Sequence, residues 1–158
     1  MYNRFEIGSV LTVAPKTVAE ATWQDEAQKW DQFHCFRFST ILGSKTERLR
    51  ALYKKADIYV INRENVVWLM EQTHYKPPFD MLILDESTSF KDSKTKRWRA
   101  IRRIRGCFKK IVLLTGTPRP NGLMDLWAQL YLLDGGKRLG KSLTSFRSNY
   151  FLPDKRNQ

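Results

Sequence analysis

Cysteine and histidine are scarce in this chain of 158 residues, which contains two of each. Cys35 and Cys107 lie far apart in the sequence, and neither is spaced with His34 or His74 in the way that zinc ligands usually are. We therefore expect neither a disulfide framework nor a zinc site, and both thiols are predicted to be reduced.

Long apolar runs are also lacking. No segment approaches the roughly 20 apolar residues that a membrane span requires, and the first residues show no secretory signal pattern. The sequence therefore predicts a soluble, intracellular protein of the cytoplasm that has no membrane partner.

Acidic residues are the third shortage. The chain has 16 Asp and Glu against 28 Lys and Arg, which gives a formal net charge of +12. This excess favours a polyanionic partner, and a basic surface that is merely solvated is the simpler alternative. The length and the apolar content of 42% suit one domain with a core of its own.

Short apolar runs alternate with helical patterns along most of the chain. Buried strands are predicted at Ser9–Ala14, Phe36–Leu42, Ile58–Ile61, Met81–Leu84 and Ile111–Leu114. Helices are predicted at Thr17–Asp31, Thr46–Lys55, Glu64–Glu71, Lys94–Arg105 and Leu123–Leu133, before an irregular polar tail from Thr144. The tryptophans that we assign to the core are Trp23, Trp30, Trp68 and Trp127. The alternation predicts an α/β domain with a mainly parallel sheet that is covered on both faces.

The fourth predicted strand ends in two adjacent carboxylates. In Met81–Thr88 (MLILDEST), the apolar run leads directly to Asp85 and Glu86. An Asp at the end of a strand can bind Mg²⁺, and a neighbouring Glu can orient an attacking water. The alternative is that Asp85 caps a turn while Glu86 is solvated.

The fifth predicted strand ends in small and hydroxyl residues. In Ile111–Asn121 (IVLLTGTPRPN), the apolar run is followed by Thr115, Gly116 and Thr117. Their hydroxyls can bind the carboxylates of the preceding motif or a phosphate. The alternative is an ordinary strand-to-helix turn that Gly and Pro punctuate.

Taken together, the two segments resemble motifs II and III of superfamily-two DEAD/DEAH-type helicases, in particular of the Swi/Snf-like branch. Val13–Trp23 (VAPKTVAEATW) resembles motif Ia, and Val60–Glu64 (VINRE) falls where the family has its next motif. The resemblance covers Ser9 to Asp134. It implies a first RecA-like lobe, a three-layer domain of the P-loop NTPase type. It also implies ATP and Mg²⁺ as cofactors, and DNA as the partner with RNA as the alternative.

The resemblance implies roles for individual residues. Asp85 would be the acid associated with Mg²⁺, and Glu86 would position the hydrolytic water. The residues that would couple the nucleotide site to the DNA site are Thr115, Gly116 and Thr117. The residues that would lie near the DNA phosphates are Lys16, Thr17 and Arg63.

Two departures from the family pattern bear on activity. The family often has His at the fourth position of motif II, where this chain has Thr88. The glycine-rich, lysine-containing loop that holds the β- and γ-phosphates in the family is absent upstream of Ser9. We therefore expect a lobe that lacks its first strand, and weak or absent nucleotide binding by this chain alone.

The missing strand also predicts an open sheet edge. In the family, the strand of the phosphate loop lies beside the motif III strand, here Ile111–Leu114. An open apolar edge invites pairing with another chain. Three outcomes are therefore possible: self-association, a strand from a second polypeptide that also supplies the second lobe, or coverage by the chain's own N-terminal residues.

A strongly basic helix is predicted between the two motifs. Lys91–Lys110 contains ten Lys or Arg and one acid. The cations predicted on its outer face, suited to phosphates without reading sequence, are Arg97, Arg99, Arg102 and Arg103. The alternative is a solvated outer face of the domain.

These observations support two hypotheses of different kinds. In the first, residues 1–143 form a truncated first motor lobe of an ATP-dependent DNA helicase or translocase, and residues 144–158 form a polar tail leading toward an absent second lobe. In the second, the chain is a non-catalytic module derived from such a lobe that binds nucleic acid or protein, including a decoy or inhibitor.

The purified chain is expected to hydrolyse no ATP by itself, because its sequence offers nothing to hold the nucleotide phosphates. Phosphate release in the presence of duplex DNA measures this. Turnover that disappears in the Glu86→Gln variant would show the expectation to be wrong.

Overall fold

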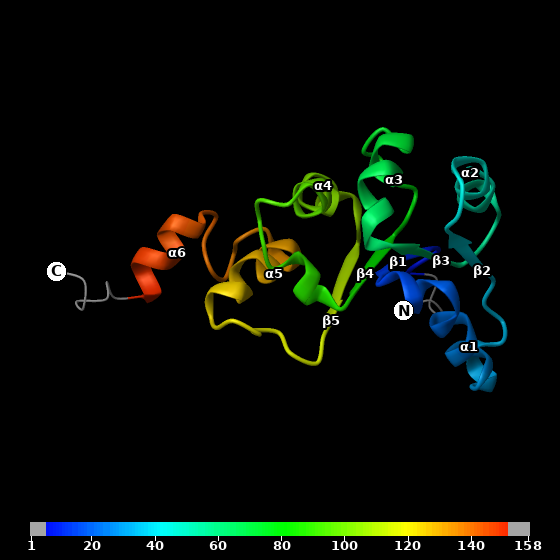
Figure 1. Ribbon diagram of the computed structural model, residues 1–158, viewed down its shortest axis with the longest axis horizontal. Helices are drawn as coiled ribbons and strands as arrows, with labels where there is room; N and C mark the ends of the chain where they lie inside the picture. The colour runs from blue at the N-terminus through cyan, green and yellow to red at the C-terminus, as the bar shows by residue number, and fades with distance from the viewer. Residues whose placement is uncertain (1–5, 152–158) are drawn as a thin grey trace.

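Parallel strands form the sheet around which the chain folds. In chain order they are β1 (Val10–Ala14), β2 (Phe38–Ile41), β3 (Ile58–Asn62), β4 (Met81–Asp85) and β5 (Lys110–Leu114). Their order across the sheet is β2-β3-β1-β4-β5, and every pairing between them is parallel (Figure 1). The computed structural model describes residues 6–151. The predicted α/β class with a mainly parallel sheet is confirmed.

One face of the sheet is covered by three helices along its whole width. These are α2 (Lys45–Tyr53), α3 (Val66–Gln72) and α4 (Lys96–Ile104), which lie above the sheet in Figure 1. Side chains of β1 and β4 that belong to this core, such as Leu11 and Leu84, are completely buried. The main hydrophobic core therefore lies between the sheet and this helical layer.

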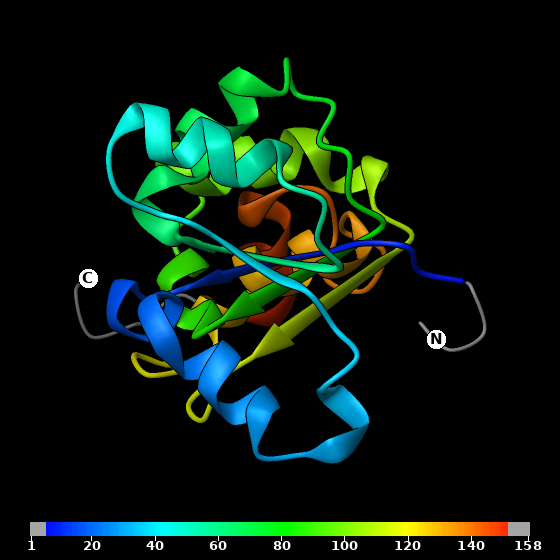
Figure 2. The same cartoon turned by 90° about the vertical axis from the view of Figure 1, so that its right-hand side faces the viewer.

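The other face is covered over only part of its width. The π-helical turn η2 (Val18–Thr22) continues into α1 (Trp23–Gln28), and both lie against the β1, β3 and β2 side of the sheet (Figures 1 and 2). On β4 and β5, the register pair Ile83 and Val112 is only half-buried, and Leu114 is 39% exposed. The predicted coverage of both faces is therefore wrong for the β4–β5 side, where an apolar strip stays open.

Two further helices extend the fold beyond β5 (Figure 1). α5 (Met124–Asp134) packs on α4, where the Trp98 indole N–H donates to the Ala128 carbonyl over 2.8 Å. α6 (Leu143–Tyr150) follows, and its Phe146 is buried in the main core. The irregular structure predicted from Thr144 is therefore wrong for residues 144–150, because one apolar side chain anchors this segment as a helix. Residues 152–158 of the predicted tail lie outside the described residues.

Short 3₁₀ turns complete the chain in the connections between the longer elements. They are η3 (Asp31–Phe33), η4 (Arg63–Asn65), η5 (Ser87–Phe90) and η6 (Arg105–Cys107). No helix within residues 6–151 is both long and apolar enough to cross a membrane.

The tryptophans differ from their predicted place in the core. Trp127 is buried and Trp23 and Trp68 are half-buried, but Trp30 is 56% exposed. The assumption of one continuous helix to Asp31 caused this error. α1 ends at Gln28, and the extended backbone of Trp30 turns its side chain out of the helical stripe.

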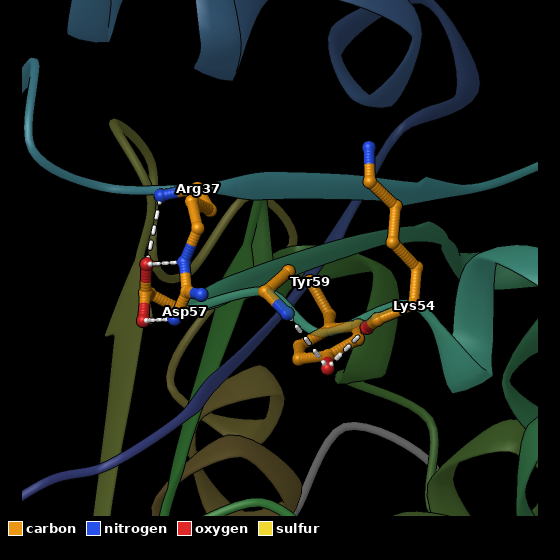
Figure 3. Close-up of polar contacts among 5 residues, drawn as sticks. Arg37, Lys54, Asp57 and Tyr59 are labelled. Carbon is orange, nitrogen blue, oxygen red and sulfur yellow. Dashed lines mark hydrogen bonds and ion pairs between the residues drawn. The ribbon is translucent and has the colours of Figure 1, made fainter.

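Two groups of polar contacts fix the start of β2 against the start of β3 (Figure 3). The carboxylate of Asp57, which is 5% exposed, accepts hydrogen bonds from the backbone N–H and the guanidinium of Arg37 at 2.8–2.9 Å. The Tyr59 hydroxyl donates to the Lys54 carbonyl over 2.7 Å and accepts from the Ala56 N–H over 3.2 Å. These contacts hold the connection between α2 and β3 in place. They thereby fix the positions at which β2 and β3 begin.

We expect the substitution Arg37→Ala to lower the free energy of unfolding by about 1–2 kcal/mol, because it leaves a buried carboxylate with fewer donors. The half-exposed position of the guanidinium keeps the loss in this range. Urea denaturation measures the change, with Arg99→Ala on the exposed side of α4 as the matched control. Equal midpoints for the two variants would contradict the role assigned to this contact.

Candidate functional site

The carboxyl ends of β4 and β5 bring the two sequence motifs together. Asp85 pairs with Leu114 in the sheet register, so Glu86 and Thr115 follow side by side. The Thr115 hydroxyl lies 3.3 Å from Glu86 Oε1, and the Thr88 hydroxyl donates to the same oxygen over 2.6 Å. The acidic pair and the Thr-Gly-Thr turn therefore share one edge of the sheet. The catalytic and coupling roles of these residues stay predictions.

Glu86 is held in an unusual backbone conformation. Its φ and ψ are 49° and 60°, in the left-handed region, which costs a residue other than Gly on the order of 1–2 kcal/mol. Its N–H donates to Asp85 Oδ1 over 2.9 Å, and the two threonine hydroxyls contact its carboxylate. This strained turn fixes both carboxylates relative to the sheet.

Asp85 has a second partner that the sequence analysis missed. The Trp23 indole N–H, from the start of α1, donates to Asp85 Oδ2 over 3.0 Å. The sequence analysis placed Trp23 in the core, although an indole N–H at a half-buried position usually needs an acceptor. The position of Trp23 at the end of the motif Ia segment was the available signal. The contact links motif Ia to motif II.

A buried hydrogen-bond network joins the residue after the acidic pair to α5 and to the segment that follows the Thr-Gly-Thr turn. The Ser87 hydroxyl is fully buried and donates to Gln129 Oε1 on α5 over 2.8 Å. The Gln129 amide in turn donates to the carbonyls of Pro118 and Asp125, over 2.7 and 3.0 Å. Gln129, which is 3% exposed, was also missed. Its polar side chain within the apolar run Leu123–Leu133 was the signal.

The rest of the Thr-Gly-Thr turn faces outward. The Thr117 N–H donates to the Thr115 hydroxyl over 3.2 Å, whereas the side of Gly116 where a Cβ would lie is open space. Both Gly116 and Thr117 are exposed. The turn is therefore fixed at Thr115 and accessible at the next two residues.

The donor set at this edge fits Mg²⁺ in part. Asp85 and Glu86 offer carboxylate oxygens, which suit a cation that also keeps water and phosphate ligands. Within residues 6–151 no group of three or more His, Cys, Asp and Glu is placed to hold a metal by itself. The loop of residues 135–142 contains three glycines, but it follows α5 rather than a buried strand. The two carboxylates are therefore the metal-ligating groups that the described residues place at this edge.

Three predicted nucleic-acid contacts lie at the same edge of the sheet. Lys16 and Thr17 follow the carboxyl end of β1, and Arg63 follows that of β3. All strands are parallel, so these residues and Asp85 share one side of the sheet. Lys16 Nζ is 3.8 Å from Glu20, and Arg63 donates to Glu64 over 3.0 Å. Both cations are thus oriented by neighbouring acids.

The arginines of α4 form a separate group. α4 leads from the carboxyl end of β4 to the amino end of β5, so its last turn lies toward the opposite edge. Arg102 lies over the Trp98 and Tyr131 rings, and Arg103 lies 3.8 Å from the Tyr75 ring centroid. Arg99 is exposed as predicted.

Arg97 differs from its predicted exposed position. It is half-buried, and its guanidinium Nε donates to the Ser89 carbonyl over 3.0 Å. It lies on the first turn of α4, where the connection from β4 folds back over the helix and supplies the carbonyl. This arginine is therefore held by a hydrogen bond to the backbone, whereas Arg102 and Arg103 contact aromatic rings.

The fold is similar to that of a solved motor protein. The SWI2/SNF2 ATPase core of Sulfolobus solfataricus, solved in complex with dsDNA, superposes with a TM-score of 0.74 at 24% identity. The match covers 93% of this chain and 29% of that chain. It shows that the sheet and helices have the RecA-like arrangement of that ATPase core.

Sequence comparisons place the chain within a family. The model of the SNF2-related domain matches residues 2–156. Protein p41 of Acyrthosiphon pisum secondary endosymbiont phage 1 is 40% identical over 92% of this chain, and Helicase domino of Drosophila melanogaster is 32% identical over 80%. The chain spans 33% of the first relative and 4% of the second. The chain belongs to the SNF2-related domain family, and the predicted likeness to the Swi/Snf-like helicases is confirmed.

We expect Gln129→Ala to destabilise the chain by about 2–3 kcal/mol, because Ser87 and the two carbonyls lose their buried partner. Urea denaturation measures the loss. Gln24→Ala, at an exposed position on α1, is the matched control. A midpoint shift no larger than the control's would mean that the network does not hold the two motifs together.

Proposed function

We propose that this chain provides the acidic and nucleic-acid-facing part of the first motor lobe of an ATP-dependent DNA translocase. Asp85 would associate with Mg²⁺, Glu86 would position the attacking water, and Thr115 would sense the state of Glu86. The contact between Glu86 and Thr115 carries this proposal, because it connects the hydrolytic residue to the turn that faces the partner. Membership of the family supports it.

The open part of the sheet indicates what completes the site. Within the described residues, β5 pairs with β4 alone, and the strip of Ile83, Val112 and Leu114 has no helix over it. The connection from β1 to β2 crosses the sheet in one direction on the α1 face, whereas α2, α3 and α4 return on the other face. Crossovers between parallel strands are almost always right-handed.

The handedness rule predicts the position of the missing unit. A strand that pairs with the free edge of β5 and leads on to β1 must place its helix on the α1 face, over β4 and β5. That is where the apolar strip lies exposed. We infer that a strand–loop–helix unit, from another part of the same polypeptide or from a second one, covers the strip and brings the phosphate-binding loop to Asp85.

The cations at the carboxyl edge supply the proposed nucleic-acid contact. Lys16 and Arg63 flank the strand ends, and the net charge of +12 attracts phosphates over the surface as a whole. The arginines at the end of α4 lie toward the other edge. We therefore assign the primary contact with nucleic acid to the carboxyl edge of the sheet. The arginines of α4 are assigned a secondary contact with nucleic acid that is independent of the first.

A non-catalytic binding module is the second candidate. The open edge and the exposed cations both favour it, because neither requires nucleotide. The two candidates differ in one respect: a motor lobe gains Mg²⁺-dependent nucleotide binding when the missing unit is supplied, and a binding module does not.

Duplex DNA is expected to bind with an affinity that falls steeply as salt is raised, because phosphate contacts release counterions. The double variant Lys16→Glu, Arg63→Glu should reduce the slope of log affinity against log salt by about two, roughly 0.9 for each contact. Fluorescence anisotropy of a labelled duplex measures the slope.

The charge-matched control is the double variant Arg138→Glu, Lys141→Glu, at two exposed positions on the connection between α5 and α6. Arg102→Glu with Arg103→Glu tests the second group of cations in the same assay. A slope that only the α4 variant changes would move the contact away from the carboxyl edge, and an affinity that is indifferent to salt would exclude phosphate binding altogether.

A further inference from the structure

An aromatic groove lies beside α1, outside the Thr-Gly-Thr turn and the acidic pair themselves. Its walls are the side chains of Trp23, Trp30, Phe33, Phe36, Phe38 and Ile58. These residues come from α1, the turn η3, and the starts of β2 and β3, which lie together at the β2 end of the sheet (Figures 1 and 2). The cavity has a volume of about 200 Å³, and a second cavity of about 440 Å³ shares Phe33, Phe36 and Phe38 with it. The two cavities are therefore neighbours that share these three aromatic side chains.

The groove leaves large apolar side chains in contact with water. Trp30 is 56% exposed and Phe33 is 40% exposed. Each aromatic side chain can remove a large apolar area from water when it is covered, at about 25 cal/mol per Å². Concave surfaces with such walls and few polar groups are typical of binding sites for apolar anchors.

The charge around the groove narrows the choice of occupant. Between Lys16 and His34 the chain has four acids (Glu20, Asp25, Glu26 and Asp31) against two lysines, although the whole chain has a net charge of +12. All four acids are exposed. Glu26, the one acid of the groove wall, pairs with Lys29 over 2.6 Å, and Glu20 lies 3.8 Å from Lys16, so the segment keeps an excess of two acids over lysines. An acidic rim on a basic protein disfavours nucleic acid and attracts a cationic partner.

We propose that this groove docks a Lys- and Arg-rich segment of a partner protein, which inserts an aliphatic or aromatic anchor between Trp30 and Phe33. A second copy of this chain fits less well, because two copies of net charge +12 repel each other. The anchor fills the apolar wall, and the basic residues beside it pair with the acids of α1. This is the mode in which an amphipathic segment binds a groove.

A docked segment would also contact a residue that is hydrogen-bonded to the motif II residue Asp85. Trp23 forms part of the groove wall, and its indole N–H donates to Asp85 Oδ2 over 3.0 Å. An anchor packed against this ring restricts its rotation and holds the N–H on the carboxylate. Partner binding is thereby coupled to the position of Asp85. An effect of this coupling on ATP hydrolysis rests on the proposed function, whereas the docking itself does not.

The test uses the whole chain and a fluorescein-labelled amphipathic peptide, KKLLKKWLKKLL, with a counterpart in which Glu replaces every Lys. The basic peptide is expected to bind at least about tenfold more tightly, against the overall repulsion of a basic protein. Trp30→Ala and Phe33→Ser are each expected to weaken it by about tenfold or more. Both side chains are partly exposed, so the variants should fold, which circular dichroism checks.

Glu26→Lys tests the charge while leaving the apolar wall in place, and should also weaken the basic peptide. Equal or tighter binding of the acidic peptide would overturn the proposal, as would affinities that none of these three substitutions changes. Concentration-dependent dimers in light scattering that Phe33→Ser abolishes would assign the groove to a second copy and equally overturn it.

The coupling to Asp85 is read from the indole N–H signals in ¹H–¹⁵N NMR spectra. Trp23→Phe identifies the Trp23 signal. Saturating basic peptide should shift this signal and slow its exchange with solvent several-fold, while the signal of Trp127, remote on α5, stays in place. Peptide binding that leaves the Trp23 signal unchanged would overturn the coupling.

Phe33→Ser should not change the affinity for duplex DNA, because Phe33 lies outside the carboxyl edge. A failure of the DNA contact and a failure of the groove are therefore seen in different assays.

Discussion

The parallel pairing of β4 with β5 is the constraint on which the site depends. Its register sets Asp85 opposite Leu114, and the next residues of each strand, Glu86 and Thr115, are then in contact. A shift by one residue would turn the side chains of β5 to the other face and separate the two motifs. The left-handed backbone of Glu86 is kept because the sheet, the threonine hydroxyls and the Ser87–Gln129 bond all fix its surroundings.

The same pairing places β5 at one edge of the sheet. β5 has a free edge within the described residues. The strip of Ile83, Val112 and Leu114 lies on the same face as α1, over the part of the sheet that α1 does not cover. Right-handed crossovers leave one position for the unit that would cover both features. The proposed function places the part that would hold nucleotide phosphates at this position, beside the acidic pair.

Trp23 gives the molecule a connection between two surfaces. One side of its ring belongs to an aromatic groove with an acidic rim, and its N–H belongs to the motif II carboxylate. A residue shared in this way allows a protein partner and a nucleotide site to influence each other, since coupling between sites is reciprocal. The groove, the carboxyl edge and the end of α4 are three separate surfaces on one small domain.

The sequence by itself determined the strands, most of the helices and the positions of motifs II and III at strand ends, because apolar runs, periodicity and turn residues are local signals. The tertiary structure alone decided which strands are neighbours. It therefore also decided that Trp23 meets Asp85 across 62 residues and that Gln129 meets Ser87 across 42. Phe146 anchors a helix in the first part of the predicted tail, and the early end of α1 exposes Trp30. Both were missed for the same reason, because packing partners that are far away in the sequence leave no local pattern.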